Sequence, residues 1–335
     1  MIKIYCNSCQ TPINKADIVH CSQCNVPLHK ECANHCRKCG AVLCDKCYGD
    51  NNFQCEGCYN PEQVFKTIRR SHLELYAACP YALYLELVKG VKPEANDYAT
   101  LGTIIHHYLD LLSNHLLTKS QALTDMTAEI MVELKDSDKI EDFLKTSVKS
   151  IDKFIEYQPS FGDKFNTEEN IIFSLDDSLP FVSCTLDRVD FVNDDIHIAD
   201  WKTGKPMSGQ KLITDLQPPL YIEAIHKKYR EYPKTFTLYY LAHDKIKMYK
   251  LLDATEGNVQ YAVDSGRNTY TLNVTEALER TKEILKRINN KNFTMPKDVS
   301  SWYCTNMCSH YKTGVCASSS KEQWKVLNDK YAGDK

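Results

Sequence analysis

The 335-residue chain lacks long apolar runs and lacks an excess of charge of either sign. No segment approaches the roughly 18 apolar residues of a membrane span, so the sequence predicts no membrane partner. The opening MIKIYCNSCQ does not have the form of a secretory signal, which indicates that the protein stays where it is made. The 41 basic residues nearly balance the 44 acidic ones, so any contact with nucleic acid needs a local basic patch.

What is present is typical of a globular protein. Hydrophobic residues make up 43% of the chain and charged residues 25%, which are ordinary proportions for a globular fold. The length suits one large core or about two to three domains.

Sixteen cysteines are the most unusual feature, and eleven of them lie within the first 58 residues. Without an export signal, paired cysteines are better interpreted as metal ligands than as redox or disulfide partners, and the cytoplasm is the expected location. The pairs CNSC, CSQC, HKEC, CRKC, CDKC and CEGC supply twelve ligands, enough for three tetrahedral zinc ions. The predicted zinc ligands are Cys6, Cys9, Cys21, Cys24, His29, Cys32, Cys36, Cys39, Cys44, Cys47, Cys55 and Cys58.

The order of these pairs resembles the cross-brace zinc modules of the FYVE and PHD-finger type. The resemblance implies one ion at Cys21, Cys24, Cys44 and Cys47, a second at Cys36, Cys39, Cys55 and Cys58, and a third at Cys6, Cys9, His29 and Cys32, with His20 and His35 as alternative ligands. The basic run that FYVE modules use for phosphoinositides is missing from ECANHCRKC. We therefore expect the module to contact DNA or a protein partner, and zinc to supply its folding free energy.

The segment FVSCTLDRVDFVNDDIHIADWKTGK, which begins at Phe181, predicts a β-hairpin that turns at Asn193-Asp194. In that register Asp187 faces Asp200, and both share one face of the sheet with Lys202. Two facing carboxylates repel each other, so a divalent cation is expected between them. An ordinary solvent-facing hairpin end with an incidental Asp-x-Lys is the alternative interpretation. Arg188 and Asp190 fall on the opposite face and are expected to be structural.

Helical and strand patterns alternate beyond residue 61. Helices are predicted around the break at Cys79-Pro80, over LGTIIHHYLDLLSNHLL, over residues 121–157, over QPPLYIEAIHKKYR and over VTEALERTKEILKRI, with strands beginning near Asn170. Helices around a mixed central sheet make the fold class α/β or α+β. The predicted domains are a zinc module over residues 1–60 and a larger domain over residues 61–335.

Four motifs occur in a fixed order: GTIIH at 102–106, LDRVD at 186–190, IADWKTG at 198–204 and LQPPLY at 216–221. Together they resemble the RecB-like branch of the PD-(D/E)XK nuclease superfamily, which includes the AddB nuclease domain and the CRISPR-associated iron-sulfur exonucleases. The resemblance covers residues 71–320 and implies a restriction-endonuclease-like core. It also implies a DNA substrate that is single-stranded or has free ends.

The resemblance implies a role for each residue of the site. The implied ligands of one or two Mg²⁺ or Mn²⁺ ions are His106, Asp187, Asp200 and the carbonyl of Trp201. Lys202 is the implied catalytic lysine, and Gln217 and Tyr221 are implied to line the site from the next helix. His107 is the alternative ligand if the helix is rotated, and packing within one helix is the alternative for Gln217 and Tyr221. Independently, carboxylate and carbonyl oxygens are the donors that these hard cations prefer.

The late cysteines fit the same resemblance, which implies a 4Fe-4S cluster held by Cys79, Cys304, Cys308 and Cys316. The spacings in WYCTNMCSHYKTGVC are wider than the family's usual ones, and four thiolates can equally hold zinc. Cys184, by contrast, lies in a predicted strand and is expected to be a small buried hydrophobe.

The resemblance therefore implies a metal-dependent DNA exonuclease of recombination, repair or phage genome processing. The alternative is a non-catalytic nucleic-acid-binding or adaptor protein that recruits partners through its zinc module.

Overall fold

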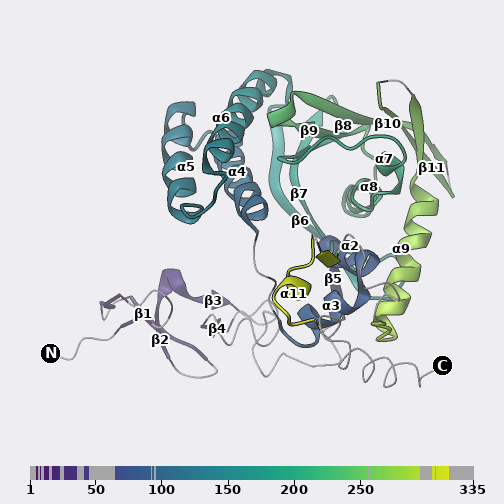
Figure 1. Ribbon diagram of the computed structural model, residues 1–335. Coiled ribbons are helices and arrows are strands. Elements are labelled where there is room, and N and C mark those ends of the chain that lie inside the picture. Colours follow the sequence, from purple (N-terminus) through teal and green to yellow (C-terminus); the bar gives the residue numbers. More distant parts are fainter. Residues whose placement is uncertain are drawn as a thin grey trace. The chain divides into compact units, whose positions relative to one another are not determined.

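The computed structural model in Figure 1 divides the chain into two compact units. One comprises Met1–Lys66, Ala78–Pro93 and Lys291–Lys335, and the other comprises Thr67–Ala77 and Glu94–Asn290. The structure describes residues 5, 6, 8, 11–14, 17–22, 26–35, 41–44, 65–91, 93, 96–255, 257–266, 268–294, 304, 305 and 307–316.

The larger unit is built on an eight-stranded mixed sheet. Its strand order is β12-β11-β10-β9-β8-β7-β5, and β6 pairs with β7 off this path. The pairs β5/β7 and β8/β9 are parallel and the others are antiparallel. The strands are β5 (Thr67–Arg69), β6 (Lys164–Phe173), β7 (Phe181–Val192), β8 (Asp195–Trp201), β9 (Thr235–Tyr240), β10 (Lys245–Thr255), β11 (Asn258–Asp264) and β12 (Thr269–Asn273).

Helices cover both faces of this sheet in Figure 1, with α4, α5 and α6 on one side and α7 and α8 within its curve on the other. The helices are α2 (Arg70–Ala78), α3 (Pro80–Leu87), α4 (Asp97–Ser113), α5 (Lys119–Glu133), α6 (Ile140–Tyr157), α7 (Lys211–Thr214), α8 (Gln217–Tyr229), α9 (Val274–Asn289) and α11 (Ser309–Lys312), with 3-10 turns η1 (Lys30–Cys32), η3 (Gln158–Ser160) and η4 (Leu241–His243). The predicted mixed sheet flanked by helices is therefore confirmed.

Local sequence explains where several elements begin. Pro80 is the first residue of α3 and lacks an N–H to donate, so α2 ends at Ala78 as the sequence predicts. Asn96 caps α4 by accepting the Ala99 N–H at 2.9 Å. Two predicted boundaries were wrong. The helix predicted over residues 121–157 is interrupted between α5 and α6, and β6 begins at Lys164 rather than near Asn170. Its first half alternates exposed and half-buried side chains, so it has no run of apolar residues to mark it.

Side chains that alternate along β8 point in turn to the core of this unit and to its polar face. Trp201 is buried, and its ring packs on Phe154, Phe161 and Tyr239 at centroid distances of 5.3–5.5 Å. Because successive side chains of a strand point to opposite faces, this anchoring directs Asp200 away from the aromatic cluster.

Short antiparallel pairs form the N-terminal elements β1 (Ile18–His20), β2 (Pro27–His29), β3 (Asn34–His35) and β4 (Val42–Leu43). Their small core includes Leu28 and Leu43 together with Cys6, Cys21 and Cys44. So few apolar side chains bury little area, and an apolar core alone would leave such a module marginal. No helix among the described residues is long and apolar enough to cross a membrane.

Arg188 and Asp190 form a buried ion pair, as their predicted structural role requires. Arg188 Nε donates to Asp190 Oδ1 at 2.9 Å, and the Phe165 ring lies 3.7 Å from its guanidinium. Gly162 binds both partners, because its N–H donates to Asp190 and its carbonyl accepts from Arg188. The pair therefore ties β7 to the segment before β6.

We expect Asp190→Ala to lower the free energy of unfolding by about 3–5 kcal/mol, because it leaves Arg188 charged and buried without its partner. Urea denaturation measures this change. Lys145→Ala, which removes an exposed ion pair with Glu141, is the control and should change stability by less than about 1 kcal/mol. Equal losses in the two variants would contradict the structural role of the Arg188–Asp190 pair.

Candidate active site

The β7–β8 hairpin has the register that the sequence predicts. Asn193 and Asp194 make the turn with φ angles of 51° and 68°, the left-handed conformation of a two-residue hairpin turn. Val189 pairs with Ile198, and Arg188 pairs with Ala199. One further step in this register places Asp187 opposite Asp200, just beyond the last paired residues.

Two strands share one edge of β7 and leave a gap between them. β5 pairs with residues 181–183 of β7, whereas β8 pairs with residues 188–192. Since β5 runs parallel to β7 and β8 runs antiparallel to it, the carboxyl ends of β5 and β8 point toward each other across residues 184–187. The gap therefore gathers side chains from three strands.

Both aspartates of this gap are buried and are held by specific contacts. Asp187 Oδ2 accepts the backbone N–H of Trp201 at 2.6 Å, and Asp187 Oδ1 lies 3.3 Å from His106 Nδ1. Asp200 Oδ1 accepts from the Gln217 side-chain amide at 2.5 Å. These contacts fix the two carboxylates in orientation as well as in position.

Lys202 contacts both Asp200 and Gln217. Its Nζ lies 2.7 Å from Asp200 Oδ2 and donates a hydrogen bond to Gln217 Oε1 at 2.6 Å. Gln217 thus holds Asp200 and Lys202 together from the first residue of α8. One turn later on α8, Tyr221 donates its hydroxyl to the carbonyl of Thr185 at 2.6 Å. Gln217 and Tyr221 therefore face the strands, beyond any packing within their own helix.

A cavity of about 660 Å³ collects these side chains. Its lining includes His106, Asp187, Asp200, Lys202, Gln217 and Tyr221, and it adds Arg70 and Glu168, which the sequence analysis did not single out. A larger cavity of about 840 Å³ lies elsewhere, beside Lys227 and Lys228. Those two lysines are already paired with Glu223 and Glu169, so the smaller cavity is the better candidate for chemistry.

Electrostatics in the smaller cavity favour a bound cation. Burial raises the pKa of Asp200, the opposing charge of Lys202 lowers it, and the like charge of Asp187 raises it further. Burial lowers the pKa of His106, but the neighbouring Asp187 outweighs burial and raises it. Asp200 Oδ2 is buried and faces the Lys202 ammonium group at 2.7 Å. Two buried carboxylates offer the oxygen donors that a hard divalent cation prefers.

Glu168 is one of the two cavity residues that the sequence analysis missed. One ligand atom each from His106, Glu168 and Asp187 lies within 4.8 Å of the other two. Burial, followed by the charge of Asp187, raises the pKa of Glu168 to about 7. The pairing of Thr167 with Arg188 and of Glu169 with Leu186 puts Glu168 beside Asp187, so correct pairing of β6 would have found it. His107, the alternative ligand, is exposed, and its ring lies against Tyr108.

Cys79 and the three late cysteines, Cys304, Cys308 and Cys316, are all buried in the smaller unit. Burial raises the pKa of the Cys79 thiol to about 11, the Ala82 N–H lowers it, and the nearby thiols of Cys308 and Cys316 raise it. Burial raises the pKa of the Cys308 thiol, and the nearby thiols of Cys316 and Cys304 raise it as well. The four sulfur atoms are thus electrostatic neighbours. Within the described part of the chain, no three of them lie within 4.8 Å of one another.

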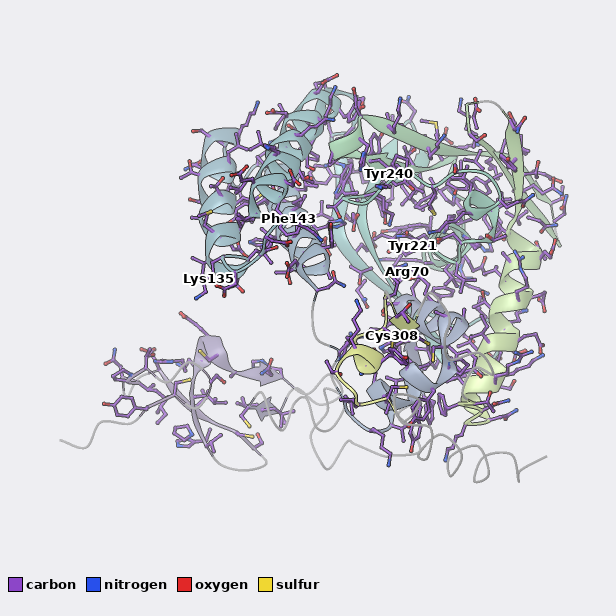
Figure 2. The ribbon with its side chains drawn as sticks, in the orientation of Figure 1. Arg70, Lys135, Phe143, Tyr221, Tyr240 and Cys308 are labelled. Carbon is purple, nitrogen blue, oxygen red and sulfur yellow. The ribbon has the colours of Figure 1, made fainter. Side chains whose placement is uncertain are left out.

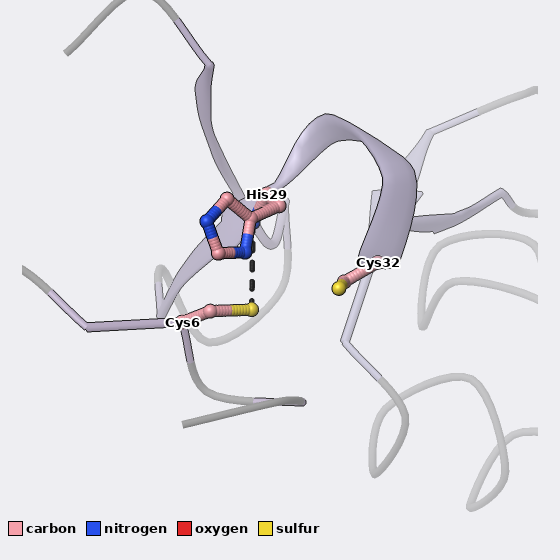
Figure 3. A group of neighbouring side chains, drawn as sticks. All are labelled: Cys6, His29 and Cys32. Atoms are coloured by element: carbon pink, nitrogen blue, oxygen red, sulfur yellow. Dashed lines mark hydrogen bonds between the residues drawn. The ribbon is translucent and has the colours of Figure 1, made fainter. Parts of the chain in front are cut away.

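Three predicted zinc ligands of the N-terminal module come together in Figure 3. Ligand atoms of Cys6, His29 and Cys32 lie within 4.8 Å of one another. The His29 backbone N–H donates to Cys6 Sγ at 3.4 Å, and its Nε2 lies 3.2 Å from the Pro12 carbonyl. The alternatives His20 and His35 are exposed and belong to no such group among the described residues.

The other zinc ligands are described only in part. Cys21 and Cys44 are buried in the same small core as Cys6. The predicted ligands that lie outside the described residues are Cys9, Cys24, Cys36, Cys39, Cys47, Cys55 and Cys58. The predicted grouping of these ligands by ion stays a prediction.

We expect Asp200→Asn to stabilise the protein in metal-free buffer at pH 7 and to remove its stabilisation by Mn²⁺. Burial and the charge of Asp187 raise the folded-state pKa of Asp200. The free energy of unfolding of the wild type therefore falls as the pH rises above the ordinary aspartate pKa. The asparagine side chain of the variant does not ionise, so this decrease should be absent from the variant. The free energy of unfolding of the wild type should rise by about 2.7 kcal/mol when the Mn²⁺ concentration is 100 times the Kd.

Thermal unfolding with EDTA and with Mn²⁺ measures both effects. Asp136→Asn, which changes an exposed carboxylate, should behave like the wild type. An Asp200→Asn protein that Mn²⁺ still stabilises fully would rule out Asp200 as a ligand.

Comparison with known proteins agrees with this geometry. The family model of the PD-(D/E)XK nuclease superfamily matches residues 70–314. A search of curated proteins found no match. The matched residues include the strands of the mixed sheet from β6 to β12, the helices α4 and α8, and every side chain named for the cavity. The chain therefore belongs to the PD-(D/E)XK nuclease superfamily.

Proposed function

We propose that the protein is a metal-dependent deoxyribonuclease, with exonuclease action as its mode. The observation that carries this proposal is the complete set of Asp187, Asp200 and Lys202 in one cavity, held by His106 and Gln217. A non-catalytic nucleic-acid-binding protein has no need of a buried, mutually repelling carboxylate pair. The intact set therefore favours an enzyme over that alternative.

The proposed ligands of Mg²⁺ or Mn²⁺ are His106, Asp187, Asp200 and the Trp201 carbonyl, with Glu168 as a further donor. When bound, such an ion lowers the pKa of a water molecule and neutralises charge that develops on a phosphate. The Trp201 N–H holds Asp187 in place, and Gln217 orients both Asp200 and Lys202. Lys202 carries a positive charge into the cavity, where it can stabilise the extra negative charge of the transition state.

A DNA substrate that is single-stranded or has free ends follows from the RecB-like resemblance. The proposed setting is recombination, repair or phage genome processing in the cytoplasm of a bacterium or an infected host. Because the overall charge is near neutral, DNA must be attracted by local basic groups.

Lys202→Ala should lower the Mn²⁺-dependent degradation of linear DNA by about 10²-fold or more, because a charge that stabilises the transition state is lost. The rate of nucleotide release from end-labelled single- and double-stranded DNA measures this loss. Lys205→Ala, which removes an exposed lysine three residues away, is the control and should retain activity. Equal activity of the wild type and Lys202→Ala would contradict the assignment.

For Cys79, Cys304, Cys308 and Cys316 we propose a 4Fe-4S cluster. All four thiols are buried, and those of Cys79, Cys304 and Cys316 are each close enough to Cys308 for one to affect the pKa of the other. The RecB-like resemblance favours a 4Fe-4S cluster over zinc at these thiols. Backbone N–H groups of Ala82 and Tyr311 reach the sulfur atoms of Cys79 and Cys308, and such hydrogen bonds tune iron-sulfur clusters.

For the N-terminal module we propose about three zinc ions, one of them bound by Cys6, His29 and Cys32 with Cys9 as the predicted fourth ligand. A hydrogen bond from His29 Nε2–H to the Pro12 carbonyl would fix the tautomer that leaves Nδ1 available to the metal. The proposed role of the module is to contact DNA or a protein partner.

His29→Ala is expected to lose one zinc ion per chain and keep its iron, whereas Cys308→Ala should lose iron and keep its zinc. Elemental analysis of the full-length protein, purified without oxygen, measures both, and each variant is the control for the other. A colourless wild type that holds zinc and no iron would contradict the cluster at Cys79 and the late cysteines.

A further inference from the structure

Arg70 occupies a position that the β5–β7 pairing brings to the active-site cavity. It is the first residue of α2 and follows β5 directly. Arg69 pairs with Ser183, so the next step along β7 sets Arg70 level with Cys184, three residues before Asp187. Arg70 therefore enters the gap on β7 from the side opposite Lys202, and both residues line the same cavity.

The guanidinium of Arg70 is held in place while part of it stays accessible. Its Nη1 donates to Glu74 Oε1 at 2.5 Å, and its central carbon lies 5.8 Å from the Tyr221 ring centroid. Figure 2 labels both Arg70 and Tyr221 in this region. The Arg70 side chain is 25% exposed. Among the described residues, Glu74 is its hydrogen-bond partner, so the other donors of the guanidinium are directed to the cavity or to solvent.

The charges around the cavity give this cation a function. Asp187, Asp200 and Glu168 contribute acidic groups to the lining of the cavity. Their negative charges repel the phosphodiester of an approaching substrate. Lys202 is engaged by Asp200 and Gln217. Arg70 is the cation of the cavity that is bound to neither aspartate, and a planar guanidinium can donate two parallel hydrogen bonds to one phosphate.

We propose that Arg70 binds a backbone phosphate of the nucleic-acid substrate, with Glu74 holding the guanidinium in position. This inference rests on the proposed nuclease function of the same cavity and adds a substrate-binding residue to it. The ligand chemistry is a phosphodiester anion, so the contact carries no base specificity.

A structural alternative makes a different prediction. Arg70 and Glu74 are four residues apart on α2, and such pairs stabilise helices by about 0.2–0.5 kcal/mol without any ligand. If the pair were only structural, its loss would change stability and leave the affinity for DNA and its salt dependence unchanged.

The test uses the full-length protein and a fluorescein-labelled single-stranded DNA of about 20 nucleotides. Fluorescence anisotropy in EDTA measures Kd over a range of salt concentrations without cleavage. We expect Arg70→Ala to raise Kd by roughly 10- to 100-fold, the effect of losing a charged hydrogen bond. The slope of log Kd against log salt should fall by about 0.7, which corresponds to one phosphate contact on a single strand.

Two further variants separate binding from folding. Arg70→Lys keeps the charge but not the paired donors, so it should restore the salt slope and only part of the affinity. Lys119→Ala removes an ion pair with Asp152 on α5 and α6, and it should leave both quantities unchanged. With Mn²⁺ added, Arg70→Ala should raise KM more than it lowers kcat.

The outcomes distinguish this inference from the function on which it rests. If Arg70→Ala binds the DNA with wild-type affinity and salt slope while the wild type degrades it, the inference fails and the nuclease assignment survives. If the wild type binds DNA through Arg70 in EDTA but never degrades it with Mn²⁺, the nuclease assignment fails and the phosphate contact survives.

Discussion

The repulsion between Asp187 and Asp200 is the constraint on which the rest of the site depends. The β7–β8 register holds these two buried carboxylates close together, and their mutual repulsion and burial both disfavour the charged state. Lys202 and Gln217 offset part of this unfavourable energy. A divalent cation would offset the remainder, so the same arrangement that strains the metal-free protein favours metal binding. Stability is in this way exchanged for function, as is common at active sites.

The site lies where two strands, β5 and β8, pair with different parts of the same edge of β7. Because β5 and β8 approach along opposite directions, their carboxyl ends meet at the same short stretch of β7. Arg70 arrives from one end and Lys202 from the other, while α8 supplies Gln217 and α4 supplies His106. The aromatic packing of Trp201 then fixes which face of β8 carries Asp200. The site is therefore positioned by the core, and it is not confined to loops.

Two chemically different kinds of metal site are proposed in one chain, and they have different physical roles. The oxygen-rich cavity suits hard ions that exchange water, whereas the cysteine groups suit soft-ligand metals that hold segments together. The N-terminal module buries few apolar side chains beside its cysteines, so metal binding would supply most of its folding free energy. The late cysteines belong to the same unit as Cys79, which lies more than 200 residues earlier in the chain. A cluster there would close a long loop of chain.

The sequence alone determined the hairpin and its turn, because Asn193-Asp194 lies between two runs of alternating apolar residues. It also predicted the register, but a slip by one residue was excluded only by the pairing in the folded sheet. The regularly spaced pairs also predicted Cys6, His29 and Cys32 as metal ligands, whereas their assignment to one ion followed from the cross-brace resemblance. Glu168 and Arg70 could not be found in this way. Glu168 lies in a polar strand without a periodic signal, and Arg70 reaches the cavity only through the parallel pairing of β5 with β7, across more than 100 residues of chain. Long-range pairing between strands is decided by how the whole sheet packs, and local patterns do not encode it.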